Sequence, residues 1–212
     1  MKNDNLEKCQ KALSEIVKDL EGGSSIELVP ILTLRSSEYK ALRFLVSLGL
    51  STFILIIVSL FLPWHLDKIW IGACIQILLF FLLNVFSFNL LDLIPRKFFE
   101  NAFAHIVDLQ ATKDFYQLDI SRTKSRRGLL LYVSLFERRI QLIPDRALTR
   151  DGLQFWHEQT SELLAFMKAN QEPEEGLVVG LKQIIQTWKL KYPKLVGDIN
   201  ELDDDVIINK KN

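Results

Sequence analysis

The chain has 212 residues, and its 26 basic and 26 acidic side chains give a formal net charge of zero at pH 7. A balanced charge gives no general attraction to nucleic acid, so no nucleic-acid partner is expected. The two cysteines, Cys9 and Cys74, lie in segments of different character, so they predict no disulfide and suit a reducing compartment.

The N-terminal segment predicts a helix followed by a strand. Apolar residues recur every three or four positions over Leu6–Leu20, which indicates an amphipathic helix, and Gly22-Gly23 ends it. Ile26–Leu34 is apolar at nearly every position, which is typical of a strand covered on both faces. Because Pro30 cannot donate to a strand ladder, it favours an edge strand or a bulge.

Two apolar runs follow, Phe44–Leu62 and Ile69–Leu91, and neither contains an acidic residue, a basic residue or a histidine. As helices they would be about 28 and 34 Å long, against a hydrocarbon core of about 30 Å. They predict a transmembrane helical hairpin closed by the short turn at 63–68. The alternative is a pair of buried helices in a soluble domain, for which apolar runs of about 10–14 residues are more typical.

Basic residues flank the predicted hairpin on its outer sides. They are Arg35, Lys40, Arg43, Arg96 and Lys97. The connecting turn carries only Lys68. Because Lys and Arg are retained on the cytoplasmic side, both termini are expected in the cytoplasm.

The rest of the chain predicts one helix, a β-hairpin and two further helices. The expected segments are a helix over Phe98–Leu118, strands at Gly128–Leu135 and Ile140–Ile143, helices at Asp151–Lys168 and Pro173–Tyr192, and a polar acidic tail at Gly197–Asn212. The residues expected to face inward are Phe98, Ala102, Ile106 and Leu109 on the first helix, Leu153, Trp156, Thr160, Leu163, Leu164 and Met167 on the second, and Leu177, Leu181, Ile184, Ile185 and Trp188 on the third.

Helices on both sides of a small sheet predict an α/β/α sandwich. The hairpin, residues 43–92, would interrupt this domain between its first piece, residues 1–42, and its second piece, residues 93–196, with residues 197–212 as the tail. Two spans return the chain to the side from which it left, so both pieces can belong to one domain.

Two stretches, IELVPILTLRSSEY before the hairpin and RRGLLLYVSLFERRIQLIPDRAL after it, resemble the TPM domain family. They are most similar to its bacterial integral-membrane branch, in which transmembrane helices are inserted in the domain. The resemblance covers nearly the whole chain and implies the same sandwich fold and a place in the bacterial inner membrane. Family members are associated with acid phosphatase activity, divalent-metal binding, photosystem repair and modulation of membrane receptors.

The resemblance also implies candidate site residues. Glu137 and Arg138 match an acidic-basic pair at the strand turn, but Asp145, Ala147 and Thr149 replace the glycines and glutamate of the family's G-x-G-L-E loop. Glycines let backbone groups approach an anion, and a glutamate supplies a hard oxygen ligand, so their loss argues against the metal and phosphatase functions. The residues that could still take part in catalysis are the matched pair, Glu137 and Arg138, and the remaining carboxylates, Asp145 and Asp151. Their structural alternatives are a surface turn and a helix cap.

Four cations, Arg122, Lys124, Arg126 and Arg127, lie within six residues. This stretch is interpreted as a solvated loop, a phosphate site or a contact with anionic headgroups, where each cation would contribute about 1 kcal/mol.

The sequence supports two hypotheses for function. The first is a membrane-tethered, non-enzymatic interaction or accessory module for another membrane protein. The second is an acid phosphatase-like hydrolase at the membrane surface, assisted by a divalent metal. The spans contain no ionisable residue, which argues against transport, and polar residues such as Ser47, Ser51 and Gln76 predict helix–helix contacts, within one chain or in a homo-oligomer.

Overall fold

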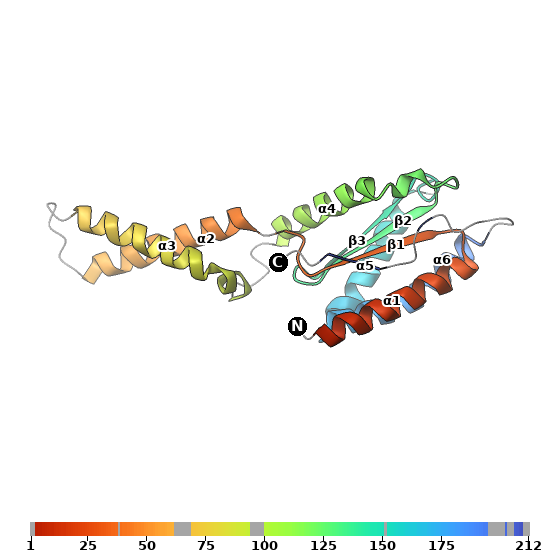
Figure 1. The fold of residues 1–212 in the computed structure, drawn as a ribbon, viewed down its shortest axis with the longest axis horizontal. Coiled ribbons are helices and arrows are strands. Elements are labelled where there is room, and N and C mark those ends of the chain that lie inside the picture. Colours follow the sequence, from red (N-terminus) through yellow and green to blue (C-terminus); the bar gives the residue numbers. More distant parts are fainter. Residues whose placement is uncertain are drawn as a thin grey trace. The chain divides into compact units, whose positions relative to one another are not determined.

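The computed structural model describes residues 3–37, 39–61, 69–93, 100–150, 152–194, 202 and 206–209 (Figure 1). The chain forms two compact units: unit 1 contains Met1–Ser37 and Asn101–Asn212, and unit 2 contains Glu38–Glu100. The helices are α1 (Asn3–Gly23), α2 (Lys40–Phe61), α3 (Ile69–Leu93), α4 (Glu100–Gln117), η3 (Ile120–Arg122, a 3-10 turn), α5 (Gln154–Ala169) and α6 (Pro173–Lys191). The strands are β1 (Glu27–Thr33), β2 (Gly128–Ser134), β3 (Arg139–Pro144) and β4 (Ile207–Asn209).

Unit 1 has a mixed α/β fold around a four-stranded sheet of order β3-β2-β1-β4. Strands β1 and β2 pair in parallel from Glu27↔Gly128 to Thr33↔Ser134, and β3 pairs antiparallel with β2. The prediction that the strand before the apolar runs shares a sheet with the strand after them is therefore confirmed. Unit 2 is an insertion in the crossover connection between two paired strands of unit 1.

Two predictions at the β4 edge of the sheet need correction. The C-terminal segment is more than a polar tail, because Ile207–Asn209 forms β4 and pairs in parallel with Ile31–Thr33. Consequently β1 is an inner strand rather than an edge strand. Pro30 is tolerated because β4 pairs only with the residues that follow it, so the missing N–H interrupts no described hydrogen bond to β4.

Helices cover both faces of the sheet (Figure 1). Alternate residues of β1 and β2 belong to the apolar cores on the two faces. Leu28 and Leu32 pack with α1, α5 and α6, whereas Val29 and Ile31 pack with α4. Every residue of β1 and β2 is buried, as the unbroken apolar runs predict.

The predicted inner face of α6 is confirmed, because all five of its predicted residues are buried. On α5, Trp156, Leu163 and Met167 are buried as predicted, but Leu153 precedes the helix and is 54 % exposed.

The predicted inner face of α4 is wrong. The buried residues are Phe103, Val107, Ala111, Asp114 and Phe115, and Leu109 is 65 % exposed. The helix has apolar residues on adjacent faces, and the face that carries two phenylalanines buries more apolar surface. Phe98 lies outside the described residues.

Unit 2 consists of α2 packed against α3. The rings of Phe44 and Phe80 meet edge to face at 5.0 Å, and Gln76 Nε2 donates to Ser51 Oγ at 3.0 Å and to Thr52 Oγ1 at 3.1 Å. The predicted role of Ser51 and Gln76 in helix–helix contact is confirmed within one chain, whereas the buried Ser47 hydroxyl has no hydrogen-bond partner among the described residues.

Among the described residues, one segment, Leu42–Ser59, is long and apolar enough to cross a membrane. The described apolar part of α3, Trp70–Val85, is shorter. The sequence predicts two spans, whereas the described residues contain one helix that could cross a membrane by length and composition, and the connecting turn at 63–68 lies outside them.

Candidate functional site

The three arginines of the predicted basic stretch make separate contacts within unit 1. Arg122 pairs with Asp119 at 3.0 Å in an exposed ion pair, and Arg127 donates to the hydroxyl of Ser25. Arg126 has a positive φ of 54° and turns its guanidinium back to donate to the carbonyl of Ser121. These three guanidinium groups therefore serve separate contacts within unit 1.

Arg126 nevertheless lines a pocket of about 290 Å³ beside α4. The pocket also contains Asp145, which directly follows β3, and Arg146. Asp145 is placed by backbone pairing, because its N–H donates to the carbonyl of Gly128 at 2.8 Å. The sheet register therefore brings together one predicted carboxylate and one predicted cation.

The carboxylate of Asp145 is only half satisfied. The side chain is 4 % exposed, and Oδ1 accepts from the Arg146 N–H at 2.7 Å. Oδ2 is buried and has no hydrogen-bond partner among the described residues. A buried acceptor without a partner costs about 1–3 kcal/mol, more when it is charged, so this oxygen favours a donor or a cation.

Glu137 and Arg138 lie elsewhere, in the turn between β2 and β3. Glu137 is 5 % exposed, and its Oε1 accepts from the Ser36 N–H at 3.1 Å while Oε2 accepts from the Ser134 hydroxyl. The carboxylate is thus engaged in joining the end of β1 to the hairpin turn. Arg138 adopts a positive φ of 50° in that turn.

The predicted catalytic carboxylates do not converge. Glu137 precedes β3 and Asp145 follows it, so the six residues of β3 separate them by about 20 Å at roughly 3.4 Å per residue. Asp151 lies outside the described residues. Among the described residues, no group of three or more His, Cys, Asp or Glu side chains could hold a metal ion.

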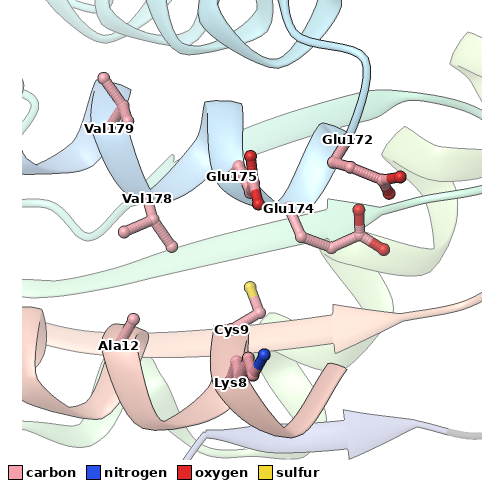
Figure 2. Close-up of a pocket in the computed structure, with 8 residues that line it drawn as sticks. All are labelled: Lys8, Cys9, Ala12, Glu172, Glu174, Glu175, Val178 and Val179. Carbon is pink, nitrogen blue, oxygen red and sulfur yellow. The ribbon is translucent and has the colours of Figure 1, made fainter. Parts of the chain in front are cut away.

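A second pocket, of about 350 Å³, lies between α1 and α6, and sequence reasoning missed it (Figure 2). It contains Glu174, the second residue of α6, which is 3 % exposed. The sequence shows only an acidic residue after Pro173, an ordinary feature of a helix N-terminus. The packing of α1 against α6 turns that residue into a buried one.

The fold defines unit 1 as a mixed α/β domain. The chain is similar in fold to the BA42 protein from the psychrophilic bacterium Bizionia argentinensis, known from an NMR structure, with a TM-score of 0.54 over 95 % of this chain and 93 % of that chain. The sequences are 17 % identical, so the likeness is one of fold. No protein-family model and no curated protein matches the chain.

Proposed function

We propose that the chain is a membrane-anchored, TPM-like α/β module that acts on another membrane protein without catalysing a reaction. In this proposal α2 and α3 form a transmembrane hairpin in the bacterial inner membrane, inserted in an α/β/α sandwich. Both termini, and with them unit 1, lie on the cytoplasmic side. The observation that carries the proposal is the apolar surface of unit 2.

That surface is large. Trp70 is 81 % exposed, Val85 73 %, and Leu45 and Phe81 each 62 %. Removing each such side chain from water contributes about 1.5–3 kcal/mol, and soluble monomers rarely expose large contiguous apolar patches. Helix α2, with 22 residues, is about 33 Å long, which matches a hydrocarbon core of about 30 Å.

The second helix supports the hairpin through its sequence. The described apolar part of α3 ends at Val85, but the sequence carries no charged residue before Asp92. With 25 residues, α3 would be about 38 Å long. The basic residues that flank the two runs favour an orientation with both outer ends in the cytoplasm.

Labelling of Cys74 tests the anchor. Cys74 is exposed on α3, so it would react readily in water but not within a bilayer. In a Cys9→Ala background, a charged maleimide is expected to leave Cys74 unlabelled in freeze–thawed native membranes and to label it in sodium dodecyl sulfate. Glu162→Cys in the same background places an exposed thiol on α5 as the matched positive control. Labelling of Cys74 in native membranes contradicts the transmembrane hairpin.

Labelling of Glu162→Cys also tests orientation. In sealed vesicles whose inner leaflet faces outward, this cysteine is expected to react, and in intact spheroplasts it is expected to be protected. The reverse pattern would place unit 1 outside the cytoplasm.

The non-enzymatic part of the proposal is supported by the separation of Glu137 from Asp145 and by the hydrogen bonds that engage Glu137. The basic stretch is proposed to lie near anionic headgroups, with a smaller gain in binding free energy than its four cations alone would give. Asp119 pairs with Arg122 and offsets its charge, so about 3 kcal/mol rather than about 4 kcal/mol remains available from four cations.

One observation favours the second candidate, an acid phosphatase-like hydrolase: the unpartnered Asp145 oxygen shares a pocket with Arg126 and Arg146. The guanidinium groups would attract a phosphate, and the carboxylate would accept a proton from an attacking water. A divalent metal here would have one carboxylate ligand from the described pocket, Asp145, so Mg²⁺ would need water and substrate phosphate oxygens as its other ligands.

Hydrolysis of p-nitrophenyl phosphate by the full chain in detergent micelles separates the two candidates. If the chain is a non-enzymatic module, the wild type, Asp145→Asn and the exposed control Glu162→Gln should show equal background rates of hydrolysis. Hydrolysis that is abolished in Asp145→Asn and retained in Glu162→Gln would favour the hydrolase over the non-enzymatic module.

A further inference from the structure

The pocket between α1 and α6 has no role in the proposed function. The residues that line it are Lys8, Cys9, Ala12, Glu172, Glu174, Glu175, Val178 and Val179. Figure 2 shows Lys8, Cys9 and Ala12 on α1, opposite the first turns of α6. Its volume of about 350 Å³ lies at the small end of the range for ligand pockets, about 300–1,000 Å³.

Glu174 is the polar group that this pocket leaves uncompensated. Its side chain is 3 % exposed, and Oε2 is buried with no hydrogen-bond partner among the described residues. Figure 2 shows the side chain leaving α6 on the side that faces α1. Burying an unpaired carboxylate costs several kcal/mol, whereas a helix N-terminus returns about 0.3–1 kcal/mol, so a bound cation would relieve the difference.

The charges around the pocket have a clear sign. Glu172 and Glu175 are exposed at its rim beside buried Glu174, and Lys8 is the one cation among the described lining residues. Burial, with a smaller effect of Glu174, raises the pKa of the Cys9 thiol to about 12, so Cys9 is a neutral wall group at physiological pH. Three carboxylates against one ammonium group select a positively charged ligand.

The remaining walls are apolar. Ala12 on α1 and Val178, which leaves α6 on the side that faces α1 in Figure 2, line the pocket and suit an aliphatic stem. A metal ion fits poorly, because no described group of three His, Cys, Asp or Glu side chains could hold one. An organic cation satisfies both the carboxylate and the apolar walls.

We infer that this pocket binds a small alkylamine, with the primary ammonium group on Glu174 Oε2 and the aliphatic stem against Ala12 and Val178. The second ammonium group of a diamine or polyamine would be attracted to the exposed carboxylate of Glu175 at the rim. Lys8 is then a competitor for the same carboxylates rather than part of the binding set.

Isothermal titration calorimetry of the full chain in non-ionic micelles, with 1,5-diaminopentane at 150 mM salt, tests the inference. We expect saturable binding with one site per chain. Glu174→Gln keeps the shape and removes the charge, and it should weaken binding at least 10-fold, because a hydrogen bond to a charged group contributes about 1.5–3 kcal/mol. Glu162→Gln, outside the pocket, should bind as the wild type does.

Two further measurements keep the result specific. Lys8→Ala is expected to bind as tightly as the wild type or more tightly, and 1-pentanol, which lacks the charge, should not bind. Tryptophan fluorescence checks that Glu174→Gln is folded. Absence of saturable diamine binding, or equal binding by Glu174→Gln, overturns the inference. Tighter binding of Nα-acetyl-lysine methylamide than of the diamine also overturns it, in favour of a lysine side chain from a protein.

Discussion

Removal of the Glu137 carboxylate should destabilise unit 1, because this side chain accepts hydrogen bonds from two buried donors. The Ser36 N–H and the Ser134 hydroxyl both donate to it, and these residues are 3 % and 0 % exposed. Glu137→Ala leaves both donors unsatisfied at about 1–3 kcal/mol each, so the free energy of unfolding should fall by about 2–6 kcal/mol. For a domain of this size that corresponds to a fall in Tm of roughly 5–15 °C.

Urea unfolding of the full chain in micelles, followed by tryptophan fluorescence, measures this loss because Trp156 and Trp188 are buried in unit 1. Glu137→Gln retains one acceptor and the side-chain shape, so it should lose less than half as much stability. Glu162→Ala removes an exposed glutamate from α5 and should change stability by no more than about 0.5 kcal/mol. If Glu137→Ala is as stable as Glu162→Ala, the structural role argued for Glu137 is wrong.

Three further predictions concern unit 1. Gly176→Ala places a Cβ 2.4 Å from the Phe166 carbonyl oxygen and should destabilise unit 1 by about 1–3 kcal/mol in thermal melts. The Cβ of Gly22→Ala has no atom within 4 Å, so this substitution should stabilise α1 by up to about 1 kcal/mol in the same measurement. Folding raises the pKa of Cys9 from 9.0 to about 12, so above pH 9 the folded chain keeps a thiol proton that the unfolded chain releases. The contribution of this group to the free energy of unfolding is therefore complete below pH 9 and is lost between pH 9 and pH 12. At pH 10.5 the wild type should have lost about 2 kcal/mol more than Cys9→Ala, relative to pH 8, and equal losses would contradict this assignment. Truncation before Val206 removes β4 and should speed amide exchange in Ile31–Thr33, with unchanged exchange as the contrary result.

The sequence predicts the elements whose patterns are complete within a few turns or strand residues. The inner face of α6 follows from apolar residues at helical spacing, and all five are buried. The β2–β3 hairpin follows from two apolar runs around a charged turn, and its antiparallel pairing is confirmed. Gln76 also joins its neighbouring helix through Ser51 as predicted, because an amide in an apolar helix needs a nearby polar partner.

Elements with ambiguous or very short patterns could not be predicted correctly. Strand β4 has three residues, and only its pairing with β1 distinguishes it from a polar tail. Helix α4 carries apolar residues on adjacent faces, so periodicity alone does not choose between Leu109, which is exposed, and Phe103 and Phe115, which are buried. The sheet makes that choice by offering an apolar surface to one face.

The sequence by itself determined that the chain carries two long apolar runs between the pieces of an α/β domain, because hydropathy and periodicity are properties of neighbouring residues. Only the tertiary structure decided which carboxylates are buried and what lies beside them. The sheet register brings Asp145 and Arg126 to one pocket. In the β2–β3 turn, Glu137 accepts a hydrogen bond from the Ser36 N–H, and the packing of α1 on α6 buries Glu174. The cost of burying a charge depends on atoms brought together from distant parts of the chain, and no local pattern records that arrangement.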